Sequence, residues 1–484
     1  MNKKFIITLL GCFGLLAANA EEVELTPMGQ LEQRTAKLES SVKKLERLKI
    51  SGYIQTQFQY GQSEEDGTYF KLNRPNSPAN NNTYENSAFI PGTDEYKGKD
   101  DFYRFGVRRG RIKFVYTEGL AEGVFQLDIT EAGIGFKDAY LGIKDPWIGT
   151  CSFKAGIFDR PFGHEITYSS SRRESPERSR IFQRLFPGER DLGASLTLQG
   201  TKDTPLNMFK LEGGLFAGNG SNTTVAFRQF DSHMDFIGRL SFAKVFGGDM
   251  SLSGGLSCYL GGVRQSDSLV YVMKDSRFVL DSDDRSNIGK FAKRQYFGVD
   301  LQYSVMTGAG LTQLRGEYIF GEHPQNAGGS FGFNATAYPA ITGPTYMRKL
   351  DGGYVILTQD LGKLPFTAVV KYDWFNPNTG VSGNDIAKPL TDEETVAGDK
   401  SANGTGNYGD ISKSNVGLGL IWRINPALRL TAYYDIAGNE KTENIKNSYN
   451  KDANGEDIKS QIISYGYEDN RPANVFTLRL QYKF

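Results

Sequence analysis

The sequence contains few of the residues from which metal and redox sites are built. Among 484 residues there are three cysteines and three histidines. Cys12, Cys151 and Cys258 are far apart in the chain, so their spacing provides neither a metal site nor a disulfide framework. Beyond residue 20, no apolar run is long enough to form a membrane-spanning helix, which excludes a helical membrane protein.

The chain also lacks a net charge. It carries 56 basic and 56 acidic residues, so nothing in the overall charge indicates a nucleic-acid partner. His164, His233 and His323 all fall in segments that we expect to be solvated loops, without a metal-ligand spacing. Residues 328–332 fit the G-x-S-x-G pattern of serine hydrolases, but that pattern requires a strand-to-helix elbow and here it lies in a Gly/Asn-rich stretch. We therefore expect no enzyme activity, no metal and no cofactor.

The N-terminus predicts an exported protein. Residues 1–20 have a basic start, an apolar centre and a small-residue exit, which is typical of a cleavable signal peptide. Residues 21–49 then show the 3,4 spacing of a short coiled coil, which we expect in the periplasm; an amphipathic helix lying on the rim of a larger fold is the alternative. The positions with this spacing are Met28, Leu31, Thr35, Leu38, Val42, Leu45 and Lys49.

From Ile50 onward the apolar period changes to two, which is typical of strands between an apolar and a watery environment. In residues 50–60, Ile54 and Phe58 alternate with Gln55 and Gln57, and the last residues of the chain repeat this pattern. Counting weaker candidates, the pattern predicts about sixteen strands of membrane-spanning length.

The segments between these strands alternate in length. Short links, such as residues 117–123 and 145–149, are followed by long polar links, such as 61–101, 158–191 and 376–411, with one exception near residues 131–135. Outer-membrane barrels show this alternation, with tight periplasmic turns and long external loops. The sequence therefore predicts an all-β fold, a closed antiparallel transmembrane β-barrel over residues 50–484 with both termini in the periplasm. A water-soluble all-β protein is the competing fold, but it has no reason to sort its loops by length.

The alternation also predicts which side chains face the lumen. Arg109, Arg111 and Lys113 share one face of a strand, and an arginine that faces lipid at the bilayer midplane costs about 2 to 4 kcal/mol. We expect them and Lys154 to face inward, where excess positive charge would attract anions, although a charge-balanced wall of ion pairs is equally compatible with the pattern. The same rule places further charged residues in the lumen: Arg239, Arg315, Lys371, Arg423, Arg429, Arg479, Asp128, Asp138, Asp300, Glu317, Asp373 and Asp435.

One long link is rich in arginine and contains no lysine. Residues 171–193 read SRRESPERSRIFQRLFPGERDLG, and two prolines argue against one long helix. A solvated surface loop is the simplest interpretation of this composition. Within a barrel, however, the segment would be the third long loop, and such loops can fold inward and narrow the channel. Guanidinium groups placed there would suit the oxygens of phosphate and carboxylate anions.

Several segments together resemble a known family. FGVRRGRIKFVYTEGL (residues 105–120), KDAYLGIK (137–144), FKAGIFDRPFGHE (153–165) and RRESPERSRIFQRLFPGERDLGASL (172–196) resemble, in order and spacing, the phosphate-selective porins of the O and P type. Later stretches agree, among them VVKYDWFNPN (369–378) and LGLIWRINPALRLTAYYD (418–435). The resemblance covers nearly all of the chain after Ile50.

This resemblance implies a sixteen-stranded homotrimeric channel in the outer membrane of a Gram-negative bacterium. It implies passive diffusion of small anions such as phosphate, with the loop at residues 159–191 folded inward. The pore-lining, anion-binding residues expected from the lumen pattern and the resemblance are Arg109, Arg111, Lys113, Lys154, Arg160, Arg172, Arg173, Arg178 and Arg190. Arg178 and Arg190 could instead attach the loop to the wall through ion pairs with Glu174, Glu177 or Glu189.

Other functions fit parts of the sequence. The outer loops are not basic, since Asp392, Glu393 and Glu394 lie in one of them, so a general or oligosaccharide porin also fits. An outer-membrane anchor or adhesin without transport belongs to a different class and would show no conductance. Energy-coupled receptors carry a folded plug domain before the barrel, for which the residues that precede the first strand are too few.

Overall fold

The computed structural model describes residues 35, 42, 46–61, 102–131, 133–218, 220, 232–326, 341, 343–388, 406, 408–442, 444 and 474–484. The chain divides into two units, Met1–Lys49 and Ile50–Phe484. The predicted signal peptide lies outside the described residues, as does nearly all of the predicted coiled coil, of which Thr35, Val42 and Glu46 are described and helical. Among the described residues, no helix is long and apolar enough to cross a membrane.

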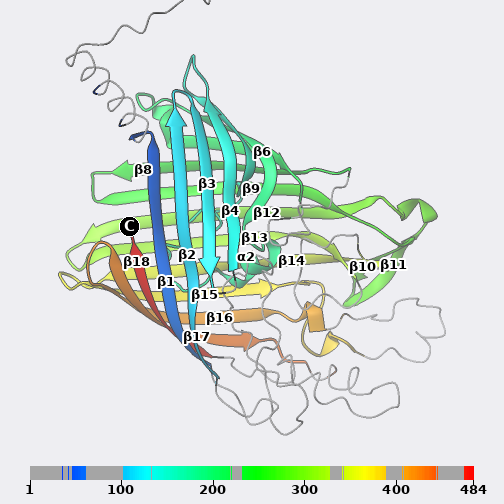
Figure 1. Ribbon diagram of the computed structural model, residues 1–484. Coiled ribbons are helices and arrows are strands. Elements are labelled where there is room, and N and C mark those ends of the chain that lie inside the picture. The colour runs from blue at the N-terminus through cyan, green and yellow to red at the C-terminus, as the bar shows by residue number, and fades with distance from the viewer. Residues whose placement is uncertain are drawn as a thin grey trace, which may run out of the picture. The chain divides into compact units, whose positions relative to one another are not determined.

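The second unit is a closed antiparallel β-barrel, which confirms the predicted fold class (Figure 1). Sixteen of the eighteen described strands form the ring, each pairing with its neighbours, and β1 closes it by pairing with β18. Closure satisfies the backbone groups of every edge, which a sheet in lipid requires. The ring consists of β1 (Leu48–Gly61), β2 (Phe102–Glu118), β3 (Ala121–Thr130), β4 (Gly133–Lys144), β5 (Cys151–Asp159), β6 (Arg190–Gln199), β7 (Phe209–Phe216), β8 (Asp235–Phe246), β9 (Met250–Arg264), β12 (Phe291–Thr307), β13 (Gly310–Gln325), β14 (Thr345–Asp360), β15 (Phe366–Asn376), β16 (Lys413–Arg423), β17 (Leu428–Asn439) and β18 (Val475–Lys483).

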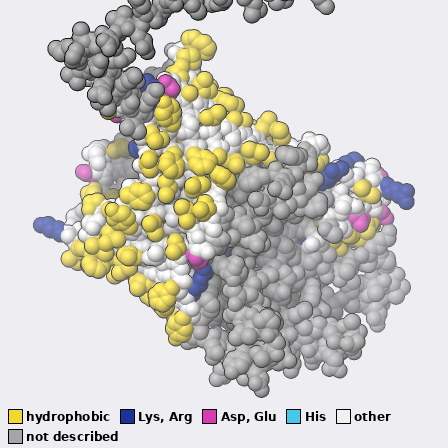
Figure 2. Space-filling model, viewed as in Figure 1, with side chains coloured by type: hydrophobic (Ala, Val, Ile, Leu, Met, Phe, Trp, Pro, Cys, Tyr) yellow, Lys and Arg dark blue, Asp and Glu magenta, His cyan; other side chains and the backbone are white. Residues whose placement is uncertain are grey.

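Side chains alternate across the wall as the sequence predicts. On β18, Leu480 and Tyr482 are 42% and 51% exposed on the outer surface, whereas Arg479 and Gln481 are buried on the inner one. Figure 2 shows the result on the face over β1 to β4, where apolar side chains are spread across the strands and most of the visible charged ones lie near the edges of the described surface. Alternation places apolar groups against hydrocarbon and polar groups in the lumen.

The connections confirm the predicted alternation of short and long links. β2 and β3 are joined by residues 119–120, and β12 and β13 by residues 308–309, whereas residues 62–101 separate β1 from β2. The exception is also present, since residues 131–132 alone join β3 to β4. Seven short turns therefore lie at one end of the barrel, the end that holds the chain terminus Phe484.

One long connection contains a hairpin that the sequence analysis did not predict. β10 (Leu269–Lys274) and β11 (Arg277–Asp283) pair with each other, and β10 also pairs in parallel with the start of β14. Tyr271 and Phe278 of the hairpin pack against Tyr346 in a small apolar cluster. The described helical turns are α2 (Arg180–Leu185), η2 (Pro205–Met208), η4 (Arg285–Asn287), η5 (Gly383–Asp385) and η6 (Tyr408–Asp410).

Candidate functional site

The arginine-rich segment connects β5 to β6 and comprises residues 160–189. It contacts inward-facing side chains from separate parts of the ring. The Tyr53 hydroxyl on β1 lies 2.6 Å from the Ser170 hydroxyl, and the Arg180 backbone N–H donates to Asp373 Oδ1 on β15 at 2.9 Å. Its helix α2 has only six residues, because Pro176 and Pro187 flank the sequence that forms it.

An apolar cluster holds the segment against part of the wall. Phe162, Ile181, Phe182 and Phe186 of the segment are at most 1% exposed. They belong to one cluster with inward-facing wall residues on β5, β7 to β9 and β12 to β17. The wall members are Phe158, Phe216, Ile237, Tyr259, Tyr296, Ile319, Leu350, Tyr354, Ile356, Val369, Phe375, Ile421 and Tyr433. The inner surface is therefore apolar where the segment packs, which the alternation alone did not predict.

Left-handed backbone conformations form both ends of the segment. Gly163 has φ +64°, and a Cβ there would overlap the carboxylate of Glu317. That carboxylate accepts the N–H groups of His164 and Glu165 at 3.1 Å each. At the other end, Gly188 and Glu189 have φ of 74° and 65°. The glycines of the FDRPFGHE and FPGERDLG motifs thus allow the chain to turn into and out of the lumen.

Glu177 binds three arginines from the wall. It receives two bonds of 2.7 Å from Arg108 and one each from Arg109 at 3.3 Å and Arg479 at 3.0 Å. Burial raises the pKa of Glu177, but the charges of Arg108, Arg109 and Arg479 outweigh burial and hold that pKa well below its usual value. Arg108 was not among the predicted site residues. Glu177 therefore attaches the segment to β2 and β18.

Glu189 forms a second attachment. It pairs with Arg178 of the segment, with Arg190 at 2.8 Å and with Lys137 on β4 at 3.5 Å. Arg190 also binds Asp138 and Asp159, both at 2.9 Å. Burial raises the pKa of Glu189, and the neighbouring cations, Arg178 first, lower it well below its usual value. The pairs of Glu189 with Arg178 and Arg190 are among those that the sequence analysis gave as an alternative to anion binding.

Most other predicted anion-binding residues have partners within the protein. Arg111 lies 3.5 Å from Asp128, Lys154 2.8 Å from Glu212, and Arg160 3.3 Å from Asp191. Arg173 donates to the carbonyl oxygens of Ser175 and Pro176 at 3.3 and 3.1 Å. Carboxylates therefore compensate the charges of Arg111, Lys154 and Arg160, whereas Arg173 has carbonyl partners.

Three cations differ from this group. Arg172 is exposed and lies over the Tyr168 ring, with 5.3 Å from its guanidinium carbon to the ring centroid. Among the described side chains, neither Lys113 on β2 nor Arg180 on α2 has an ion-pair partner, and both are half-buried. Arg180 was not among the predicted site residues. These three are therefore cations to which the described residues provide no counter-ion.

The three histidines were predicted in loops, and two of them lie there: His164 in the link before β6 and His233 in the link before β8. His323 lies within β13, fully buried, with its Nδ1 2.5 Å from the Tyr296 hydroxyl, so its predicted loop position is wrong. His164 is half-buried against Tyr168, and burial, with Arg315 and Arg239 nearby, lowers its pKa to about 3. It is therefore neutral at physiological pH. The G-x-S-x-G pattern at residues 328–332 lies outside the described residues.

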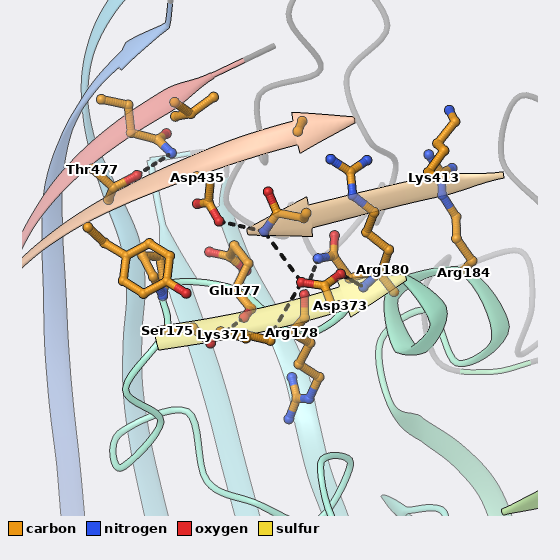
Figure 3. A pocket seen from close by; sticks show the side chains of 17 residues that line it. Ser175, Glu177, Arg178, Arg180, Arg184, Lys371, Asp373, Lys413, Asp435 and Thr477 are labelled. Carbon is orange, nitrogen blue, oxygen red and sulfur yellow. Dashed lines mark hydrogen bonds and ion pairs between the residues drawn. The ribbon is translucent and has the colours of Figure 1, made fainter. Parts of the chain in front are cut away.

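A polar cavity of about 140 Å³ lies between the segment and the inward faces of β1 and β15 to β18. Figure 3 shows Arg180, Arg184 and Lys413 together at one end of it and Thr477 at the other. Five cations and three carboxylates line it: Arg178, Arg180, Arg184, Lys371, Lys413, Glu177, Asp373 and Asp435. The cavity is therefore polar, and two of its cations, Arg178 and Lys371, are paired with Glu189 and Glu165 outside the lining.

Comparisons with known proteins agree with the fold. No protein-family model and no curated protein matches the chain. Among solved structures, Pseudomonas putida OprB at high pH is similar with a TM-score of 0.51 and 11% identity, over 92% of this chain and 96% of that one. OmpT of Vibrio cholerae in its trimer form (TM-score 0.45, 11% identity, 90% and 99% covered) and the outer membrane channel DcaP of Acinetobacter baumannii (0.43, 10%, 90% and 97%) are more remote, and no conclusion rests on them. At such identities the likeness shows the fold alone.

The fold and the distribution of side chains define the class of protein. A closed antiparallel barrel of sixteen strands with an apolar outer surface, polar side chains inside and long links at one end is a transmembrane β-barrel of the outer-membrane type. Its place is the outer membrane of a Gram-negative bacterium.

Proposed function

We propose that the protein is a porin through which small hydrophilic solutes diffuse passively across the outer membrane, with a preference for anions. The observation that carries the proposal is the polar cavity beside residues 160–189, at one end of which Arg180, Arg184 and Lys413 lie together. Cations in a confined, low-dielectric passage lower the free-energy barrier for an entering anion. The proposal includes no covalent chemistry and no cofactor.

The anion preference in this proposal depends on cations other than most of those first expected. Arg109, Arg111, Arg178 and Arg190 are ion-paired with carboxylates, so their contribution to the lumen potential is small. Arg172, Lys113 and Arg180 have no such partner among the described residues. Phosphate and carboxylates both suit guanidinium groups, and we include both among the solutes. A homotrimer, as the resemblance to phosphate-selective porins implies, is part of the proposal.

The test is the zero-current potential across a planar bilayer that separates two KCl concentrations. The protein should give a potential of the sign for chloride preference, and the triple variant Lys113→Glu, Arg172→Glu, Arg180→Glu should reverse it. Lys202→Glu is the matched control, because Lys202 is exposed in a short turn outside the lumen. An unchanged potential in the triple variant would remove these residues from the proposal, and swelling of protein-containing liposomes in neutral sugar would separately establish passive diffusion.

A second candidate is an outer-membrane anchor or adhesin without transport. One observation favours it: residues 160–189 bind the wall through Glu177, Glu189 and the apolar cluster, on β2, β4, β18 and the strands between β7 and β17. So many attachments narrow the lumen. Absence of any conductance would support this candidate over the porin.

A further inference from the structure

The cavity contains polar atoms that the protein itself leaves without hydrogen bonds. Gln59 Oε1, Asn415 Oδ1 and the Tyr433 hydroxyl are buried and have no partner, and all three residues line the cavity. Gln59 is 3% exposed, Asn415 8% and Tyr433 1%. Buried polar atoms in folded proteins nearly always have a partner, so three in one cavity mark a place where a bound molecule can supply hydrogen bonds.

The remaining bonds of these side chains fix what each can do. Gln59 Nε2 donates to Thr477 Oγ1 at 3.4 Å, and Asn415 Nδ2 donates to Asp435 Oδ1 at 2.8 Å and Asp373 Oδ2 at 3.4 Å. Because the amide nitrogens take these acceptors, the two amide oxygens are left to accept bonds from a ligand. A ligand that binds these two oxygens must therefore carry hydrogen-bond donors.

Glycines of β16 hold the third group in place. A Cβ at Gly417 or at Gly419 would overlap Tyr433, so the ring lies directly on the backbone of the neighbouring strand. The hydroxyl of a ring fixed in this way can donate or accept one bond at one position. Tyr433 thus lines the cavity with its ring packed on this backbone.

Electrostatics decide which donors suit the cavity. An ammonium group could donate to the amide oxygens, but the cations Arg180, Arg184 and Lys413 at one end of the cavity disfavour a cationic ligand. Hydroxyl groups donate without adding charge. At the end opposite Thr477, Arg180 lies with Arg184 and Lys413, and a guanidinium fork matches a carboxylate. A ligand with hydroxyls at one end and an anionic group at the other could therefore bind the amide oxygens and Arg180 at the same time.

We propose that this cavity binds a small polyhydroxylated anion, an acidic sugar of the uronate type. Its hydroxyls donate to Gln59 and Asn415 and bond with Tyr433, and its carboxylate binds Arg180. The inference rests on the proposed function in one respect, since the solute reaches the cavity through the open lumen. The residues that line the cavity lie on β15 to β18 and β1 toward the long links, so a solute from outside reaches them before the periplasmic turns.

The test is calorimetric titration of the purified protein in detergent with three probes. Glucuronate carries hydroxyls and a carboxylate, glucose carries hydroxyls alone, and cyclohexanecarboxylate carries the charge on a ring without hydroxyls. Glucuronate should bind about tenfold or more tightly than either, because each alternative loses one set of bonds. Equal affinity for the three probes, or no binding, would mean that water satisfies these atoms and would overturn the proposal.

Two variants locate the binding. Tyr433→Phe removes only an unpartnered hydroxyl and should weaken glucuronate about three- to tenfold, as expected for one hydrogen bond. Tyr372→Phe is the matched control, because Tyr372 lies on the outer face of β15 and should have no effect. Arg180→Gln should weaken glucuronate and leave glucose unchanged. Full affinity in Tyr433→Phe or Arg180→Gln would place the sugar elsewhere and contradict the assignment.

The binding experiment and the conductance experiment can fail independently of each other. Conductance steps without glucuronate binding would overturn this site and leave the porin intact. Glucuronate binding that Tyr433→Phe weakens, in a protein without conductance, would support the site and contradict passive transport.

Discussion

Replacement of Glu177 by glutamine tests the attachment of residues 160–189 to the barrel. The Glu177 side chain is 14% exposed, and the side chains of Arg108, Arg109 and Arg479 that bind it are each at most 5% exposed. The substitution keeps the shape but leaves three buried positive charges without their shared counter-ion. Removal of one member of a buried ion pair costs about 3 to 5 kcal/mol, and the partial exposure of Glu177 favours the lower end, about 3 kcal/mol.

The assay is urea unfolding in detergent micelles, followed by tryptophan fluorescence. Glu131→Gln is the control, because Glu131 also pairs with an arginine, Arg104, but is 38% exposed. An exposed pair contributes at most about 1 kcal/mol, so this variant should unfold close to the wild type. If Glu177→Gln and Glu131→Gln shift the unfolding free energy equally, the buried cluster does not stabilise the fold and the reasoning is refuted.

Three further predictions concern acid, backbone and salt. The pKa values of Glu177 and Glu189 are depressed in the folded state, so the stability that these carboxylates contribute should be complete above about pH 4.3. It should be lost as the pH falls from there through their folded-state pKa values. If the urea concentration at the unfolding midpoint stays the same when the pH is lowered below 4, this prediction is contradicted. Gly163→Ala should destabilise the barrel by more than about 1 kcal/mol relative to Gly362→Ala, because both have φ above +60° but only Gly163 faces a carboxylate; equal unfolding midpoints would exclude the overlap. Anion preference should decrease as KCl rises from 0.1 to 1 M, since the Debye length shortens from about 10 to 3 Å, and a zero-current potential independent of salt at a fixed ratio would argue against electrostatic selection.

The barrel was predictable from the sequence because the pattern that produces it lies within each strand and its nearest neighbours in the chain. Lipid on one side and water on the other impose a period of two, so Gln55 and Gln57 on β1 and Arg479 on β18 could be placed inward from their neighbours alone. The long and short links could likewise be recognised from length and composition. Both signals need no knowledge of distant contacts.

The site was less predictable because its contacts join distant parts of the chain. Arg479 and Glu177 are 302 residues apart, and nothing near either residue indicates the pair. Inward-facing apolar residues such as Ile237 and Ile319 pack on the segment, which a simple rule of polar lumen and apolar exterior misses. Strand β13 extends beyond the bilayer-length pattern, and for that reason His323 was assigned to a loop. The segment itself was marked in advance by its enrichment in arginine and by its resemblance to the phosphate-selective porins.

Single-channel recording in a planar bilayer tests the central claim most directly. A barrel that retains a water-filled path past residues 160–189 should give discrete conductance steps when the purified protein inserts, and the steps should carry more anion than cation current. Insertion confirmed by protease protection, without any conductance step, would mean that the segment closes the lumen, and the porin account would be contradicted.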